Sequence, residues 1–273
     1  MTPERDPAPS EGGDLVRVQR HGDPGHVAEV VLDRPEALNA VSTALAGRLT
    51  AVLADLAADP AVRAVVISSS RPRAFCVGAD LKQRDRLDQA SLRASRAVTR
   101  LAYRGVLDLP VPSIAAVAGF ALGGGFEIAL GCDLIVADDS AVLGLPEVSV
   151  GVLPGGGGTQ LLTRRVGWSR AADLIFTARR VDAEEGARLG LIDRLVPSGR
   201  AREAALELAA AVAANSPVGV RNAKRAMRLG AGTDLAAALD IEDAAWEAVA
   251  FSADRAEGVR AFVERRPPRW PTP

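Results

Sequence analysis

The sequence predicts an α/β core followed by a helical C-terminal part. Strand and helix patterns alternate through residues 13–199, and helical periodicity dominates residues 200–273. The chain has 273 residues, 48% of them apolar, which is ample for a buried core. Residues 1–12 are rich in proline, glycine and charge, so we expect a disordered tail there.

The first half of the core alternates strands with helices. DLVRVQR and HVAEVVLDR alternate apolar and polar residues around the turn signal HGDPG, a pattern typical of a β-hairpin. Ser42 is placed to cap a helix that runs to about Asp59, because leucine and valine recur there at helical spacing. A buried strand at 64–68, an amphipathic helix at about 89–107 and the strand SIAAVAG follow.

Glycine-rich turns punctuate the second half. GGGFEIALGC opens a helix, DLIVA is typical of a strand, and Gly155–Gly158 precede a helical stretch through Leu162. From Arg200 the chain is almost wholly helical, broken at SPVG and LGAGT, and the proline-rich end RRPPRWPTP cannot continue a helix.

Charge, cysteine content and hydropathy exclude several classes of protein. The 33 basic and 34 acidic side chains give a net charge of −1, so no global field favours polyanions or anionic membranes. Cys76 and Cys132 lie in apolar surroundings, where buried free thiols are common. No stretch reaches the roughly 18 uninterrupted apolar residues of a membrane span. We therefore expect a cytoplasmic protein without membrane contact.

Two carboxylates indicate the chemistry. Glu127 and Glu147 each follow a short glycine or proline signal, in ALGGGFEIAL and GLPEVSVGVLPGGGGT. Two carboxylates on neighbouring turns can hold one water between them and move protons in either direction. A lone glutamate in a helix is usually a solvated surface side chain. Glu127 stands among apolar neighbours, however, so an elevated pKa is expected. The pair predicts acid/base catalysis.

The turn Gly123–Gly125 predicts half of an oxyanion hole. The first N–H groups of a helix have no internal partner and lie at the positive end of the helix dipole, so they stabilise an oxygen that gains negative charge. A second donor is expected from AFCVGADLK at 74–82, where a glycine turn follows a strand. The alternative for an isolated triple glycine is a plain tight turn.

Other motifs argue against competing chemistries. The run Gly155–Gly158 lacks the GK[ST] of a phosphate loop, so we expect it to shape a wall of the active site and start a helix. EVSVG lacks the leading glycine of a nucleophile elbow, and the two histidines, His21 and His26, belong to the predicted hairpin. No spacing typical of metal ligands occurs.

Taken together, these segments resemble the enoyl-CoA hydratase/isomerase, or crotonase, family. The resemblance extends from VVLDRPEALNAVS through RAFCVGADLK, LPVPSIAAVAGFALGGGFEIALGCDLIVA and LGLPEVSVGVLPGGGGTQLLTRRVG to ADRAEGVRAFVERR. It implies the crotonase fold, a superhelix of ββα turns whose helical C-terminal part, here residues 200–273, builds homotrimers that often pair into hexamers. It also implies an acyl-CoA substrate and no metal or redox cofactor, coenzyme A being part of the substrate.

The resemblance assigns the catalytic groups. The backbone N–H groups of Ala79 and Gly124 would bind the thioester oxygen, which gains charge during reaction. Family members that hydrate enoyl thioesters carry glutamate at the positions of both Glu127 and Glu147, as this chain does. The implied reaction is syn hydration of a trans-2-enoyl-CoA to the 3-hydroxyacyl-CoA. Glu147 would protonate the α-carbon and Glu127 would activate the water. An enoyl-CoA isomerase, or another acyl-CoA activity of the family, is the alternative.

The resemblance also assigns substrate contacts. The segment 74–82 would hold the adenine and pantetheine portions through main-chain groups, and Phe262 and Arg265 match a C-terminal region that in relatives can reach a neighbouring subunit's ligand. Relatives commonly carry lysine where this chain has Arg265. The contacts implied are Ala74, Cys76, Ala79, Asp80, Leu81, Lys82, Gly124, Phe262 and Arg265.

A basic stripe leaves a different function open. Arg93, Arg96, Arg100 and Arg104 share one face of the predicted helix, within a stretch of seven basic and two acidic residues from 82 to 105. One relative binds AU-rich RNA through a similar helix, so an RNA-binding protein with residual activity is a second hypothesis. No aromatic stacking platform accompanies the stripe, so nucleic acid is the less favoured partner. A solvated face or a subunit contact is the ordinary interpretation.

Overall fold

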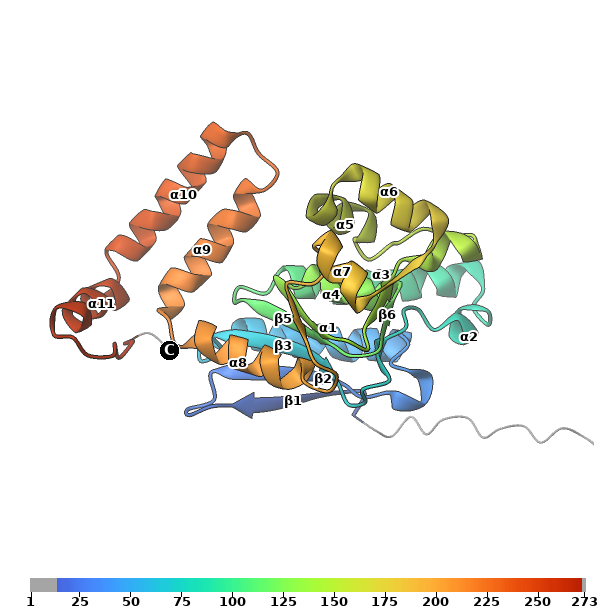
Figure 1. Ribbon diagram of the computed structural model, residues 1–273, viewed down its shortest axis with the longest axis horizontal. Helices are drawn as coiled ribbons and strands as arrows, with labels where there is room; N and C mark the ends of the chain where they lie inside the picture. The colour runs from blue at the N-terminus through green and yellow to red at the C-terminus, as the bar shows by residue number, and fades with distance from the viewer. Residues whose placement is uncertain (1–13, 272–273) are drawn as a thin grey trace, which may run out of the picture.

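The computed structural model describes residues 14–271, so the predicted tail at 1–12 lies outside the described residues. The strands form a six-stranded sheet of order β1-β2-β3-β5-β7-β10 and a four-stranded sheet of order β4-β6-β8-β9 (Figure 1). Their bounds are β1 Val16–His21, β2 Val27–Leu32, β3 Ala64–Ser69, β4 Ala74–Cys76, β5 Ser113–Val117, β6 Phe120–Leu122, β7 Leu134–Asp138, β8 Val142–Gly144, β9 Arg180–Asp182 and β10 Arg194–Val196.

Helices cover the sheets and form the C-terminal part. The α-helices are α1 Thr43–Ala58, α2 Leu81–Arg84, α3 Gln89–Leu107, α4 Gly124–Gly131, α5 Gly158–Val166, α6 Trp168–Thr177, α7 Ala183–Leu189, α8 Ala201–Ala213, α9 Pro217–Gly230, α10 Leu235–Ala250 and α11 Ala253–Val263. Two 3-10 helices, η1 Pro35–Ala37 and η2 Pro146–Val150, follow β2 and β8.

The larger sheet is buried on both faces. β1 and β2 form the predicted antiparallel hairpin, and β2, β3, β5, β7 and β10 are parallel. Val65 and Ile67 pack into the cluster that includes α1, α3 and α4, whereas Ala64 and Val66 pack against α8. Parallel strands covered by helices on both faces are apolar along their whole length, which explains the run AVVIS.

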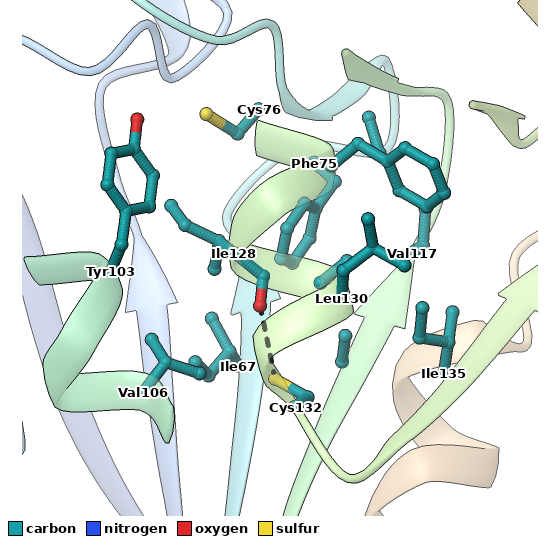
Figure 2. Packing of buried hydrophobic residues seen from close by; sticks show 14 of the residues in the cluster. Ile67, Phe75, Cys76, Tyr103, Val106, Val117, Ile128, Leu130, Cys132 and Ile135 are labelled. Atoms are coloured by element: carbon teal, nitrogen blue, oxygen red, sulfur yellow. Dashed lines mark hydrogen bonds between the residues drawn. The ribbon is translucent and has the colours of Figure 1, made fainter. Parts of the chain in front are cut away.

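The larger of the two clusters surrounds α4. Every residue of this eight-residue helix is buried, and Figure 2 shows Ile128 among Phe75, Tyr103 and Val106. The Cys132 thiol donates a hydrogen bond to the Ile128 carbonyl. A helix buried on all sides holds its first turn in one place, which suits a site built on that turn.

Several predicted elements are confirmed and others were missed. Ser42 caps α1 by accepting a hydrogen bond from the Leu45 N–H group, and α3 has the predicted bounds. α5 continues past Leu162 to Val166 and stops at Gly167, where φ is 83°. SPVG does more than interrupt a helix: Pro217 begins α9 and Ser216 caps it. The four-stranded sheet, α6 and α7 were not predicted.

The helical C-terminal part divides into two regions. α8 packs on the six-stranded sheet, although the sequence grouped it with residues 200–273. α9, α10 and α11 extend away from the core, with α9 packed against α10 (Figure 1). Lys224 of α9 anchors this projection: its ammonium donates to the Val111 carbonyl and to Asp133, each at 2.7 Å.

Candidate active site

Three strands of the smaller sheet deliver the predicted catalytic segments. β4 leads toward Gly78 and Ala79, β6 leads into Gly123 and Gly124, and β8 leads into η2, which carries Glu147. β4, β6 and β8 are adjacent and parallel. The carboxyl ends of parallel strands meet at one edge of a sheet, so segments separated by up to about 70 positions in sequence become neighbours.

The two predicted oxyanion turns touch. Gly78 has φ of 90°, and a Cβ placed on it would lie 2.8 Å from the Leu122 carbonyl oxygen and 3.1 Å from the Gly124 nitrogen, so only glycine fits. Among the described residues, no acceptor takes a hydrogen bond from the N–H group of Ala79 or of Gly124. Two free, adjacent backbone donors are what an oxyanion hole requires.

Glu127 is held by the glycine-rich loop before α5. Glu127 is only 3% exposed. Its Oε1 accepts hydrogen bonds from the N–H groups of Gly156 at 2.6 Å and Gly158 at 2.8 Å. Burial raises the pKa of this carboxyl, and the two backbone hydrogen bonds oppose the rise. The hydrogen bonds orient the carboxylate and favour its ionised form, as a base that receives a proton needs.

Glu147 is held differently. Its Oε2 is buried and has no hydrogen-bond partner among the described residues, while Oε1 lies against the Gly123 turn, 3.0 Å from where a Cβ on Gly123 would be. Burial raises the pKa of Glu147 to about 7, with repulsion from Glu127 adding to the rise. At neutral pH this carboxyl therefore carries a proton in a large fraction of molecules. Both glutamates thus lie beside the first turn of α4.

Two residues that the sequence interpretation did not assign also face the site. The hydroxyl of Tyr103, on α3, lies 2.1 Å from where a Cβ on Gly124 would be. Burial and the charge of Glu127 raise the pKa of Tyr103, so its hydroxyl stays protonated. The positive charge of Arg84, on α2, opposes the rise in the pKa of both glutamates. Tyr103 is the one tyrosine of the chain, but only the fold brings it to Gly124.

The predicted substrate contacts of 74–82 lie in two environments. Ala74 and Cys76 are buried in β4, and the Cys76 thiol, whose pKa burial raises to about 12, points into the core and donates to a backbone carbonyl. Asp80 caps α2 and pairs with Arg34 at 2.7 Å. Leu81 and Lys82 are exposed on α2. Cys76 and Asp80 therefore have only main-chain groups to offer a ligand.

A pocket of about 390 Å³ opens next to Ala74. Leu38, Asn39, Arg71 and Arg73 contribute to its wall. The sequence interpretation did not single out these residues, because the two arginines flank a proline in a loop and η1 approaches them only in the fold. The pocket offers two cations near the start of β4.

Phe262 and Arg265 lie apart from these groups within one chain. Phe262 is 85% exposed on α11, and Arg265 follows the end of that helix. Both belong to the projection that extends away from the core (Figure 1). Contact between these residues and a ligand at Gly124 requires a second chain, as the family resemblance implied.

Two absences within residues 14–271 bear on other functions. No three histidine, cysteine, aspartate or glutamate side chains gather there as metal ligands would. No helix within the same residues combines the length and apolarity needed to span a bilayer.

Comparison with known proteins identifies the family. The profile of the enoyl-CoA hydratase/isomerase family matches residues 22–273. A crystal structure of enoyl-CoA hydratase from Bacillus anthracis superposes with a TM-score of 0.91 and 39% identity, covering 94% of this chain and 98% of that one. DspI of Pseudomonas aeruginosa gives a TM-score of 0.89 and 36% identity, over 96% and 100% of the two chains. The mitochondrial methylglutaconyl-CoA hydratase of Mus musculus is 40% identical over 263 residues, 94% of this chain and 83% of that protein.

The chain belongs to the enoyl-CoA hydratase/isomerase family and has the crotonase fold. The resemblance and the fold class predicted from the sequence are thereby confirmed.

Proposed function

We propose that the protein is an enoyl-CoA hydratase. The observation that carries the proposal is the meeting of two unlike carboxyls, Glu127 and Glu147, with two free backbone donors, Ala79 and Gly124, at one edge of the smaller sheet. The two backbone donors can bind a thioester oxygen, and the two carboxyls can move two protons. Hydration of a carbon–carbon double bond conjugated to a thioester needs both.

The different environments of the two glutamates suit them to different proton-transfer steps. The Ala79 and Gly124 N–H groups bind the thioester oxygen as it becomes enolate-like. Glu127, oriented by hydrogen bonds from Gly156 and Gly158 that favour its ionised form, accepts a proton from water as the water oxygen bonds to the β-carbon. Glu147, in the protonated form that its raised pKa favours, gives its proton to the α-carbon. One water is consumed, and the proton that Glu127 gained returns to Glu147, directly or through solvent, to complete the cycle.

The rest of the thioester finds complementary surfaces. Arg71 and Arg73 line the pocket beside Ala74 and would neutralise phosphates of coenzyme A bound there. Leu38, in the wall of that pocket, accepts a hydrogen bond from the N–H group of Val77, two residues before Ala79. The reaction itself requires neither a metal nor a redox cofactor.

We also propose a homotrimer, alone or paired into a hexamer. The C-terminal projection leaves large apolar side chains uncovered, among them Met227 (75% exposed), Phe251 (86%) and Phe262 (85%). Exposure on this scale is typical of a surface that another chain covers. Such a contact would also supply Phe262 and Arg265 to a neighbour's ligand.

Purified protein and crotonyl-CoA test the proposal. We expect the absorbance of the enoyl thioester to fall and the product mass to rise by one water. A product of unchanged mass would instead establish an isomerase, which the same pair of glutamates could serve by moving a proton between two carbons. No change in absorbance or mass would refute the proposed activity.

A further inference from the structure

A second cavity is lined in part by Tyr103, whose hydroxyl lies next to Gly124. Its volume is about 590 Å³, and it lies between α3 and the loop Gly155–Gly157. Three arginines of the basic stripe contribute to its wall, together with Ala97, Leu101 and Leu107. No acidic side chain lines it. The stripe is therefore part of a pocket as well as a helix face.

The cavity adjoins the catalytic groups through two shared residues. Gly156 lines the cavity and donates its N–H group to Glu127. Tyr103 lines it as well, with its ring 2.7 Å from where a Cβ on Gly156 would be and its hydroxyl next to Gly124. A thioester held at Gly124, with its reacting carbons at Glu127, would direct the remaining acyl carbons along this wall.

Arg96, Arg100 and Arg104 differ in the partners that their guanidinium groups already have. Arg104 pairs with Asp108 at 2.7 Å, and Arg96 donates to the Gly155 carbonyl oxygen. Arg100 makes no ion pair or hydrogen bond with any residue in 14–271. Its guanidinium therefore has no anion to bind, although it lines a cavity beside the reaction centre.

We propose that this cavity binds a second carboxylate at the far end of the acyl group, so that the preferred substrates are enoyl-CoA thioesters of dicarboxylic acids. Arg100 forms the ion pair, and Arg96 adds positive charge. Leu101, Leu107 and Ala97 accommodate the intervening carbons. A guanidinium binds a carboxylate through two parallel hydrogen bonds, which gives such a site both affinity and direction. The inference rests on the proposed function but concerns which thioester binds.

Binding of saturated thioesters tests the proposal without catalysis. Glutaryl-CoA and butyryl-CoA differ only in a terminal carboxylate. By calorimetry, the full chain should bind glutaryl-CoA at least about tenfold more tightly, a difference of about 1.4 kcal/mol. Arg100→Gln should remove this preference, and Arg100→Lys should keep part of it. Arg93→Gln is the matched control, because Arg93 lies on the same helix outside the cavity wall.

Hydration assays separate this inference from the proposed function. The ratio of kcat/KM for glutaconyl-CoA to that for crotonyl-CoA should fall about tenfold in Arg100→Gln and stay level in Arg93→Gln. Tighter binding of glutaryl-CoA without any hydration would refute the hydratase and leave the carboxylate site standing. Equal affinities for both saturated thioesters would overturn the inference. Low-salt retention of AU-rich RNA that Arg100→Gln abolishes, alongside equal affinities, would assign the arginines to nucleic acid instead.

Discussion

The α/β core and the C-terminal projection differ in the side chains that they bury and in those that they leave exposed. The core surrounds two carboxyls with apolar groups and a few backbone donors, so that their pKa values rise. The projection buries Lys224, Asp254 and Glu257 but leaves large apolar side chains in solvent: Trp246 is 64% exposed and Phe251 86%. The catalytic groups proposed above thus come from one chain, whereas the exposed apolar side chains of the projection fit the proposed contact with another chain.

Removing a catalytic carboxylate should have the largest effect. Glu127→Gln and Glu147→Gln keep the side-chain shape but cannot exchange a proton, so each should lower kcat for crotonyl-CoA hydration by about 10³-fold. Glu203→Gln, on the exposed surface of α8, is the matched control. Near wild-type turnover in either active-site variant would show that hydration does not use the pair.

The second largest effect should follow removal of the Lys224–Asp133 ion pair, which anchors the projection to the core. Asp133 also accepts a hydrogen bond from Arg228 at 2.8 Å; burial opposes its ionisation, but the two cations more than offset this and lower its pKa. Lys224→Met leaves a largely buried carboxylate with Arg228 as its one remaining cation beside the Ser113 N–H and hydroxyl groups, and removing one member of a buried pair costs about 3 kcal/mol. Urea denaturation measures this loss. Arg228→Met should cost less, because Arg228 is 35% exposed. Equal losses would contradict the assigned anchor.

The raised pKa of Glu147 predicts a pH profile. The proposed hydration uses the protonated form of Glu147, and burial raises the pKa of this carboxyl to about 7. A group with a raised pKa loses its proton as pH rises through that value, so kcat/KM should be level well below pH 7 and fall by up to about tenfold per pH unit above it. Rates measured from pH 5.5 to 9 test this. A rate that rises through pH 7 would reverse the roles given to the two glutamates.

The smallest effect on stability should follow substitution on the projection's apolar face. Trp246 is exposed in the single chain, and substitutions of exposed residues change stability little. Trp246→Glu should therefore change the free energy of unfolding of the isolated chain by no more than about 0.5 kcal/mol. The mass measured by sedimentation should fall from that of an oligomer to that of one chain. Asp240→Asn on the same helix is the control. An unchanged mass would exclude this face from the interface.

Sequence patterns revealed the long elements and missed the short ones, for physical reasons. α1 and α3 repeat their apolar residues over several turns, so periodicity locates them. β4, β6, β8 and β9 have three residues each, too few for any repeat, yet three of them bring the catalytic turns together. Glu127 and Glu147 were predicted from their turns. Tyr103, Arg84 and the cavity at Arg100 arise from contacts between distant segments, which no local pattern encodes.

A crystal structure with 3-hydroxybutyryl-CoA tests the central claim most directly. The account predicts that the thioester oxygen accepts hydrogen bonds from the N–H groups of Ala79 and Gly124, and that the 3-hydroxyl lies between Glu127 and Glu147. A thioester oxygen bound elsewhere, or a hydroxyl in contact with neither carboxyl, would contradict it.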